Sequence, residues 1–590
     1  MKLFLPLFTL LFCLSACEIK TKNDHTTYYE NHNKEASAPY DIGIAYWKAL
    51  AADFDQLKLL SYKETDAGFP LHLAVWSYDG KFKPNQIKKA KRPVFLVNNA
   101  IHPGEPDGVD ASMMLIRDIL KSPELQQTYK DIVICIIPYY NIGGALYRNS
   151  HTRTNQNGPE AYGFRGNGRN YDLNRDFMKM DSKNMWAFAE IFHDWEPHIF
   201  LDNHVSNGAD YQHVMTYLAT QEDKLGSELA KYMRVTLNPV LEKKMKEKGF
   251  PMSPYVNVWG TSPDASGIDQ FYDSPRYSSG YAALFNTIAY VAETHMLKPY
   301  KERTEATYAL METLLVKLAE DAKGIVAMKE RQVQIYASAT TLPLNWEHDK
   351  SYADSIEFLG YDAEYKQSDI GTHQRLYYDR SKPFQKTIAF RNSYNAIDII
   401  DVPLAYVLPQ SQHHIIDRFR ANKIEMDVLE KDSAFEVTVY HYADFETGTN
   451  PYEGHYLHHN TTVTSSTKTI QFRKGDYVVS TIQKGARYIV QALEPTAVDS
   501  YFNWNFFDAY LQQKEHFSPY VFEDKASKIL TENPELKRNF EAAKIKDKNL
   551  ANNWYAQLDW IHKQSKHYEK THLRHPIFRV EGKQKWLRNQ

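Results

Sequence analysis

The chain is poor in cysteine, with three in 590 residues. Two of them, Cys13 and Cys17, fall within the first 17 residues, and Cys135 stands alone in the apolar run 132–137. A disulfide framework of the kind that holds small secreted domains together is therefore excluded. The continuously apolar flanks of Cys135 offer nothing that would lower a thiol pKa. They predict a buried strand residue rather than a nucleophile.

The chain also lacks an excess of charge of either sign and lacks long apolar runs. Lys and Arg number 70 against 73 Asp and Glu, a formal net charge of -3. Without a basic field, nucleic acid is not expected as a partner. No stretch reaches the roughly 18 consecutive apolar residues of a membrane helix, so the mature chain is expected to have none.

The N-terminus has the pattern of a secretory signal over residues 1–17. A charged start is followed by the apolar run 3–14 and a small-residue exit, Ser15-Ala16-Cys17. Residues 14–17 resemble the bacterial lipobox, whose cysteine becomes acylated, which makes Cys17 the expected lipid attachment point and the membrane an expected partner. An ordinary cleaved signal peptide is the alternative. The lipobox reading predicts a protein of the bacterial cell envelope, facing the periplasm or the exterior.

Four further segments follow from changes in pattern along the chain. Residues 18–41 are polar and aperiodic, which predicts a flexible tether. Residues 42–330 alternate strand-like and helix-like runs, which predicts an α/β fold with a mixed twisted sheet flanked by helices. Residues 331–500 predict a β-rich accessory domain. Residues 501–590 predict a helical segment that packs back on the rest of the chain.

The first cluster of chemical interest joins His102 and Glu105 through a Pro-Gly pair after a strand-like run. A Pro-Gly turn brings the two side chains together. An imidazole and a carboxylate form part of a zinc ligand set, which needs a third protein ligand and keeps one position for water in catalytic sites. Taken alone, the motif is weak and more typical of a solvated surface turn.

Three more signals follow in order along the chain. Residues 171–177 carry Asp172, Asn174 and Arg175, His204 stands near the end of a strand-like run, and Glu293 interrupts an apolar strand. Open α/β sheets place their sites at strand ends, and burial penalises a carboxylate inside a strand. Each residue could have a purely structural role instead, such as a loop arginine, a core histidine or an edge-strand glutamate. Purely structural roles do not explain why all of these signals occur together in this order.

In this order the motifs resemble the M14 family of zinc carboxypeptidases: HxxE, a basic residue, a DxNR box, a lone histidine after a strand and a late glutamate on a strand. The resemblance covers roughly residues 42–330. It implies a carboxypeptidase-like fold, a peptide substrate and one zinc ion per chain held by His102, Glu105 and His204. It also implies that the enzyme removes C-terminal residues from peptides by means of a metal-activated water. Glu293 would be the general base of this reaction.

The resemblance assigns four further roles. Asp172 would accept a hydrogen bond from the outer nitrogen of a ligand imidazole, which fixes the tautomer. Asn174 and Arg175 would hold the terminal carboxylate of the substrate, for which a guanidinium has the right geometry. Arg153 would polarise the scissile carbonyl and stabilise the oxyanion.

Several assignments stay open at this level. Residues 159–170 look like an insertion, which makes Arg148 and Arg165 rivals of Arg153. The specificity pocket is expected to include Ser278. The mobile tyrosine of the family is not placed securely: counting back from Glu293 leads to the neighbourhood of Phe271 and Tyr272, and Tyr277 and Tyr281 are also available.

Two other functions compete with peptide hydrolysis from the C-terminus. One keeps the metal and changes the substrate: a zinc amide hydrolase acting on N-acyl amino acids or cell-wall peptides. The other is a lipoprotein that binds peptides or glycans without turnover through its β-rich domain. Glu293 discriminates against the second, because a binding protein has no need of a carboxylate within that strand.

Overall fold

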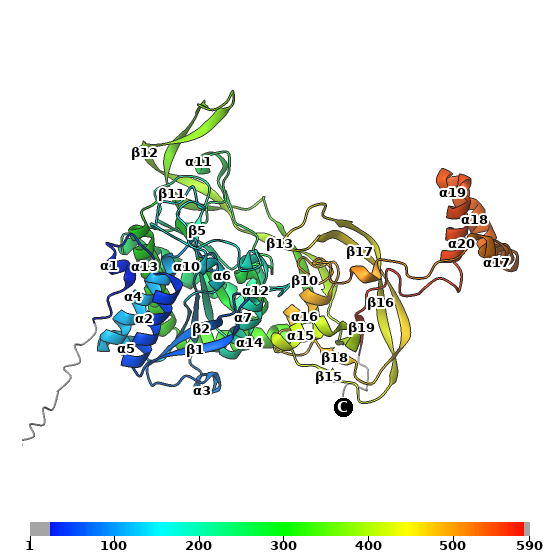
Figure 1. Cartoon of the computed structure of the whole chain (residues 1–590), viewed down its shortest axis with the longest axis horizontal. Coiled ribbons are helices and arrows are strands. Elements are labelled where there is room, and N and C mark those ends of the chain that lie inside the picture. Colours follow the sequence, from blue (N-terminus) through cyan, green and yellow to red (C-terminus); the bar gives the residue numbers. More distant parts are fainter. Residues whose placement is uncertain (1–23, 583–590) are drawn as a thin grey trace, which may run out of the picture.

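The computed structural model describes residues 24–582 and is built from two sheet-containing units and a helical one (Figure 1). The first unit holds an eight-stranded sheet in the order β1-β2-β4-β3-β5-β9-β6-β7. Its central strands β4, β3, β5 and β9 are parallel, and antiparallel pairs flank them. The strands are β1 (Leu57–Glu64), β2 (Pro70–Ser77), β3 (Val94–Asn98), β4 (Val133–Ile137), β5 (Ile199–Ser206), β6 (Met215–Ala219), β7 (Ser253–Pro254) and β9 (Ile288–His295).

Both faces of this sheet are covered, which explains why its central strands are continuously apolar. Successive side chains of a strand point to opposite faces, so Phe95 and Val97 of β3 join one core cluster, whereas Val94 and Leu96 join another. Helices α2 (Tyr40–Asp53), α4 (Asp107–Lys121), α10 (Asn238–Glu247) and α13 (Tyr300–Glu320) cover the first face. Helices α7 (Lys183–Trp195) and α12 (Ser278–Leu284) cover the second. The expected mixed α/β sheet flanked by helices is confirmed.

The predicted tether is wrong for residues 24–41. Helix α1 (Tyr28–Asn31) begins at a capping box formed by Thr27 and Glu30, and the side chain of Tyr29 is fully buried. Tyr29 packs edge-on against Tyr300 of α13 with ring centroids 5.7 Å apart. The polar composition did not indicate this packing, because it depends on a few buried side chains, among them Tyr29, Ala38 and Tyr40. Residues 1–23, with the predicted signal and Cys17, lie outside the described residues.

The second unit follows helix α14 (Ala322–Ala337) and is built around a six-stranded sheet in the order β15-β18-β14-β19-β16-β17. Its helices α15 (His413–Ala421) and α16 (Ala486–Leu493) pack toward the first unit, and one core cluster contains residues of both. The two units therefore share a continuous apolar interior. The strands are β14 (Ala405–Leu408), β15 (Asp427–Val428), β16 (Ser433–Thr447), β17 (His458–Phe472), β18 (Tyr477–Ser480) and β19 (Phe578–Val580).

A long hairpin projects from the top of the first unit in Figure 1. It is formed by β11 (Asp354–Gln367) and β12 (Gln374–Arg391), and β12 pairs with β8 (Ile268–Asp269) of the first unit. Strands β10 (Thr341–His348) and β13 (Tyr394–Asp401) connect the hairpin to the second unit. The β-rich texture of residues 331–500 thus comes from three separate sheets.

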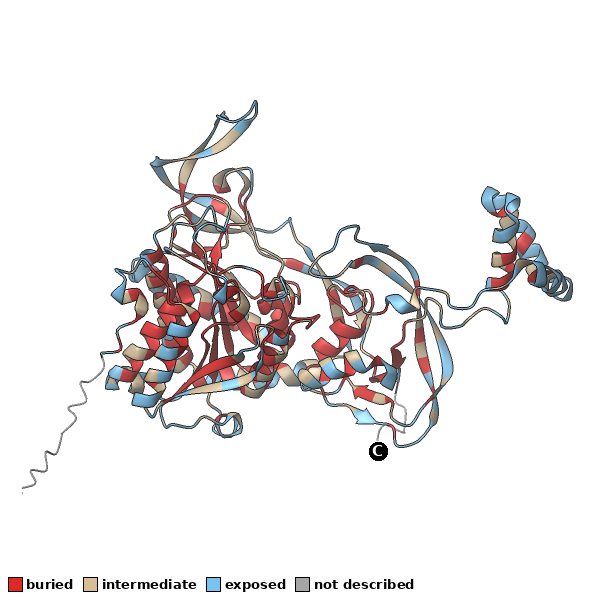
Figure 2. Ribbon diagram, in the orientation of Figure 1, coloured by how far each residue is buried: buried red, intermediate tan, exposed pale blue. Residues whose placement is uncertain are grey.

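The C-terminal segment packs back on the rest of the chain only in part: Tyr501, Phe502 and Phe507 join the core cluster that both sheet-containing units share, whereas the four helices that follow do not. Helices α17 (Pro519–Glu532), α18 (Pro534–Lys546), α19 (Lys548–Asn552) and α20 (Trp554–Lys563) form their own small core around Phe522 and Phe540. Figure 2 shows this unit standing apart, with its buried residues turned inward and a mostly exposed outer surface. The chain then returns, and β19 pairs with β14 and β16.

Between residues 24 and 582, none of the helices combines the length and apolar character needed to cross a bilayer. Cys135 is buried in β4, and burial raises the pKa of its thiol well above the ordinary value. Its predicted structural role is therefore consistent with the fold.

Candidate metal centre and substrate cavity

Two of the predicted ligands are presented by the turn between β3 and α4. The backbone N–H of Glu105 donates to the carbonyl of His102 at 2.8 Å, which closes the turn and brings both side chains to one side. Gly104 within the turn allows the side chain of Arg153 to approach, since a Cβ there would lie 2.4 Å from Arg153 Cδ. The Pro-Gly spacing therefore serves both the ligands and the arginine beside them.

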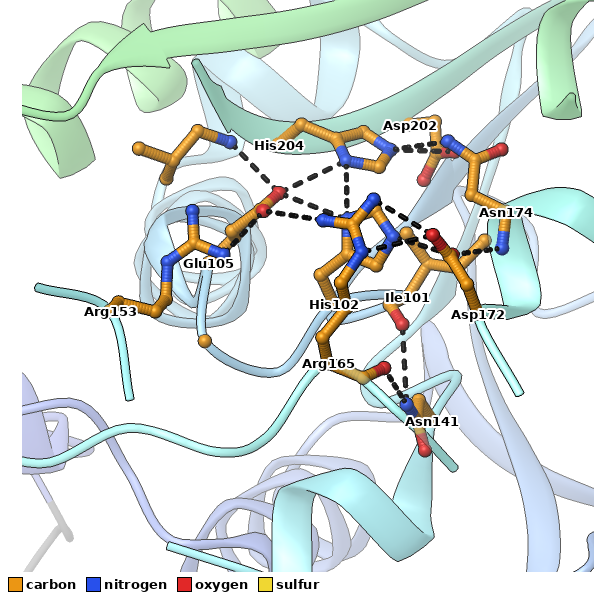
Figure 3. A network of polar contacts seen from close by, with 12 residues as sticks. Ile101, His102, Glu105, Asn141, Arg153, Arg165, Asp172, Asn174, Asp202 and His204 are labelled. Atoms are coloured by element: carbon orange, nitrogen blue, oxygen red, sulfur yellow. Dashed lines mark hydrogen bonds and ion pairs between the residues drawn. The ribbon is translucent and has the colours of Figure 1, made fainter. Parts of the chain in front are cut away.

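The third predicted ligand, His204, comes from β5 and completes a buried group. Figure 3 shows both imidazoles turned toward the carboxylate of Glu105. Nδ1 of His204 lies 3.0 Å from Glu105 Oε2 and 3.1 Å from Nδ1 of His102, and the His102 Nδ1 to Glu105 Oε2 distance is 3.3 Å. These three side chains could hold a metal ion.

The outer nitrogens of both rings face carboxylates. His102 Nε2 lies 2.9 Å from Asp172 Oδ1, and His204 Nε2 lies 3.0 Å from Asp202 Oδ2. Carboxylates accept, so each ring directs the N–H of Nε2 to its partner, and once Nδ1 is deprotonated its lone pair faces Glu105. Three acceptors then converge on one point, an arrangement that a cation stabilises. Two imidazoles and one carboxylate with room for water fit zinc.

The charges around Glu105 keep it ionised. Burial opposes ionisation, but the nearby Arg153 and His102 outweigh it and hold the pKa of Glu105 well below its ordinary value. Its Oε1 lies 2.8 Å from Arg153 Nη1, and its Oε2 accepts from the backbone N–H of Val205 at 3.0 Å. For His204, burial is outweighed by Asp202, which raises the pKa of the imidazole well above its ordinary value.

Glu293 lies beside this group on the neighbouring strand. It is the register partner of His204 across the parallel pair β5 and β9, so both side chains leave the same face of the sheet. The side chain is half-buried and lines the cavity described below. Burial raises the pKa of Glu293 to about 7, which is suited to exchanging a proton near neutral pH.

A cavity of about 520 Å³ opens over the three possible ligands and is also lined by Asn174 and Arg175. Asp172 fixes these two residues, because its side chain accepts from the backbone N–H of Asn174 at 3.0 Å while it also contacts His102. The same carboxylate thus connects the possible metal ligands to a cationic end of the cavity. Ser278, which also lines the cavity, donates its backbone N–H to Asn174 Oδ1 at 3.1 Å.

Of the three arginines that the sequence left open, two reach the cavity. Arg153 and Arg165 both line it, and both approach Glu105 Oε1, at 2.8 and 3.7 Å. Arg165 also forms an ion pair with Asp172 Oδ2 at 2.8 Å. Arg148 instead donates to the backbone carbonyls of residues 37 and 161. Arg148 is therefore excluded as the rival of Arg153.

The positions considered for the mobile tyrosine also differ in whether they line the cavity. Phe271 and Tyr277 line the cavity, and Tyr277 is the one of the two with a hydroxyl. Tyr272 packs near Tyr394 with ring centroids 5.5 Å apart, and Tyr281 is fully buried in the core. Tyr277 is thus the predicted candidate that the fold leaves available.

Sequence reasoning missed two groups at this site. Asp202 was not assigned a role, although it precedes His204 by two residues on one strand and must share its face. Tyr255 also lines the cavity, and burial raises the pKa of its hydroxyl. Alternation along β5 was the signal that could have found Asp202. Tyr255 lies in an irregular segment and gave no such signal.

A mixed α/β sheet with a buried His–Glu–His group at its strand ends and a carboxylate beside it is typical of a zinc hydrolase. The family model for zinc carboxypeptidases, Peptidase M14, matches residues 44–315. The match over this segment supports an M14-type zinc carboxypeptidase, a metallopeptidase, and the His102, Glu105 and His204 group is able to bind the zinc that the family implies.

The chain is also similar to several named proteins. Carboxypeptidase 2 of Trichophyton rubrum is 19% identical over 425 residues, which cover 69% of this chain and 72% of the relative. Among solved structures, a metallo-carboxypeptidase from Burkholderia cenocepacia aligns with a TM-score of 0.35 at 14% identity, covering 47% of this chain and 69% of that one. Carboxypeptidase A from Helicoverpa armigera aligns with a TM-score of 0.36 at 14% identity, covering 50% and 74%.

Proposed function

We propose that the protein removes residues one at a time from the C-termini of peptides, with zinc held by His102, Glu105 and His204. The observation that carries this proposal is the position of Arg175. Its guanidinium lines the same cavity as the metal group, and Asp172 contacts both His102 and the backbone of the Asn174–Arg175 segment. A substrate carboxylate held there would bring the adjacent peptide bond to the metal group.

Zinc bound at this group would lower the pKa of a water molecule and polarise the scissile carbonyl. Glu293 then accepts the proton that the attacking water loses as its oxygen bonds to the carbonyl carbon. When the carbon–nitrogen bond breaks, Glu293 returns that proton to the leaving amine. Arg153 donates hydrogen bonds to the negative charge that develops on the carbonyl oxygen.

Asn174 and Arg175 determine which peptide bond is cut. The Arg175 side chain is 21% exposed, so a cation is held within the cavity wall. Its Nη1 lies 3.8 Å from Asp172 Oδ2, an oxygen that also pairs with Arg165 at 2.8 Å, and a peptide's terminal carboxylate is a geometrically matched further partner for the guanidinium. An enzyme that cuts internal bonds would have no use for this cation next to the metal group.

We further propose that acylation of Cys17 anchors the protein in the bacterial cell envelope, facing the periplasm or the exterior. The support is the lipobox-like sequence of residues 14–17, which precede the described part of the chain. Lipid chains attached there would retain the enzyme at a membrane without a spanning helix.

The test compares a good peptide substrate with a free C-terminus and the same peptide with an amidated C-terminus, using zinc-loaded enzyme. Amidation should lower kcat/KM at least about tenfold, the effect of losing a charge-assisted pair. Arg175→Ala should largely abolish the preference, whereas Arg331→Ala, at a position with a 55% exposed side chain on α14, should keep it.

Mass spectrometry of the products identifies the bond that is cut. Equal rates on both peptides, or cleavage at internal bonds, would reject the exopeptidase proposal. Such a result would favour a zinc amide hydrolase that acts on cell-wall peptides or N-acyl amino acids. Binding without any turnover would favour the non-catalytic lipoprotein.

A further inference from the structure

A tight turn of the second unit reaches the cationic end of the cavity. It lies between β16 and β17, where the backbones of Tyr452 and His455 exchange hydrogen bonds of 2.7 and 3.0 Å. The two residues between them, Glu453 and Gly454, have φ values of +49° and +83°. Positive φ at both central positions is typical of a type I′ turn. A Cβ at Gly454 would also lie 2.9 Å from the hydroxyl of Tyr171, so glycine is required there.

The turn is anchored on both sides. Nε2 of His455 lies 2.6 Å from Asp181 Oδ2 of the first unit, and its Nδ1 lies 2.5 Å from Asn505 Oδ1 of the second. A histidine bonded at both nitrogens cannot rotate without losing a partner. The turn therefore has a fixed place relative to the cavity.

From this place the turn contacts residues 172–175. Asn174 and Arg175 of this segment are proposed to bind the substrate's carboxylate and are called the carboxylate clamp below. The hydroxyl of Tyr452 accepts a hydrogen bond from Nε of Arg175 at 3.0 Å. The next residue, Glu453, accepts from the backbone N–H of Asp172 through Oε2 at 2.8 Å. Both turn residues lie outside the segment 44–315 that matches the family model. Tyr452 and Glu453, which lie beyond the family domain, thus support the carboxylate clamp on its side facing the second unit.

These contacts determine which way the guanidinium points. Nη1 of Arg175 donates to the carbonyl of Asn174 at 2.8 Å, and the ring of Tyr277 covers one face with its centroid 4.5 Å from Cζ. Within residues 24–582, the hydrogen bonds of this side chain engage Nε and Nη1 and leave Nη2 for a substrate. A cation fixed in this way loses less conformational entropy when it binds a carboxylate.

Packing holds the ring of Tyr452 independently of its hydroxyl. The ring lies nearly parallel to Trp504, with centroids 6.1 Å apart and an interplanar angle of 24°. The guanidinium of Arg276 lies 5.4 Å from the Tyr452 ring and is paired with Asp499 at 2.7 Å. Replacing Tyr452 by phenylalanine should therefore remove the hydrogen bond to Arg175, together with the hydroxyl's interaction with Arg276, and keep the ring in place.

We propose that Tyr452 is a positioning residue that orients Arg175 toward the substrate's terminal carboxylate, so that the second unit forms part of the specificity apparatus. This inference rests on the proposed function, in which Arg175 binds that carboxylate. It adds a role for residues 331–500, to which the family domain assigns none.

The experiment measures kcat and KM of zinc-loaded full-length enzyme on the free-acid and amidated forms of one peptide. Tyr452→Phe should raise KM for the free-acid peptide about tenfold, the loss of one hydrogen bond to a charged group, with little change in kcat. Kinetics on the amidated peptide should stay unchanged. Added to Arg175→Ala, the Tyr452→Phe change should have no further effect, because Tyr452 acts through that arginine.

Tyr456→Phe is the matched control, since Tyr456 is 45% exposed a few residues further along the chain, and it should leave every parameter unchanged. An unchanged KM in Tyr452→Phe, with the preference lost in Arg175→Ala, would overturn this inference and leave the proposed function standing. An equal loss in the wild-type and Arg175→Ala backgrounds would also overturn it. A wild-type enzyme without any free-acid preference would overturn the proposed clamp and this inference together.

Discussion

His204 and Glu293 are direct register partners in two adjacent parallel strands, β5 and β9. The pairing places a possible metal ligand and a carboxylate on one face of the sheet, and the two positions are far apart in the sequence. Strand pairing fixes this geometry more rigidly than a loop could. The assignment of a ligand and a base to these positions leads to the first prediction.

Glu293→Gln should keep about one zinc per chain and lower kcat at least about 100-fold, because it removes the proton acceptor and no metal ligand. His204→Ala should lose both zinc and activity. Metal analysis of the purified variants and a peptide assay measure the two effects. Normal turnover by Glu293→Gln would show that another group is the base.

Asp202→Ala should weaken zinc binding by about 10- to 100-fold, the range for carboxylates that orient a ligand imidazole. The reason is that Asp202 approaches His204 Nε2 at 3.0 Å and holds the ring with Nδ1 toward Glu105. Competition with a chelating dye measures the affinity. Asp417→Ala, at a position with a 52% exposed side chain on α15, is the control and should bind zinc like the wild type. Unaltered affinity in Asp202→Ala would contradict the role given to Asp202.

Zinc binding should weaken as the pH falls. Asp202 raises the pKa of His204 above its ordinary value of 6.5, so the metal-free protein keeps a proton on this imidazole at higher pH than an exposed histidine would. Zinc must displace that proton, and its affinity should rise with pH until the imidazole is neutral. Calorimetric titrations in buffers of different ionisation enthalpy count the protons released. A binding constant that is independent of pH between 6 and 8 would contradict this mechanism.

Cys17→Ser should release the protein from membranes into the soluble fraction, because Cys17 is the expected site of acylation. Cys13→Ser is the matched control and should remain with the membranes, since Cys13 lies within the segment expected to be removed. Fractionation of cells followed by immunoblotting measures the distribution. Retention of Cys17→Ser in the membrane fraction would contradict the lipobox interpretation.

The sequence was sufficient to predict the central sheet and the group of residues that can hold the metal. Apolar runs such as that of β3 are long enough to predict buried parallel strands, and His102, Glu105 and His204 each stand at or near the end of one. Motif order along the chain then predicted their convergence. Asp202 was within reach of the same reasoning, because residues two apart on a strand share a face.

Contacts between residues of different units could not be predicted from local sequence patterns. The residues between Tyr452 and His455 predict a turn, but nothing local indicates that Tyr452 meets Arg175, 277 positions earlier in the chain. Arg153 and Arg165 could not be distinguished either, since both are near Glu105 in the folded protein. The contact between Tyr452 and Arg175 depends on how whole units dock, which no periodicity encodes.

The place of β19 in the second sheet imposes an order on folding. Residues 578–580 lie between β14 and β16, so they join the β15-β18-β14 half of the sheet to the hairpin of β16 and β17. They leave the ribosome only after all four helices α17 to α20 have been made. The first unit has its strands and helices long before that moment, whereas the sheet bearing residues 452–455 closes late because it depends on a contact of long sequence separation. A chain that folds from its N-terminus onward, during synthesis or after export, would therefore form its metal group before the sheet whose Tyr452 contacts Arg175.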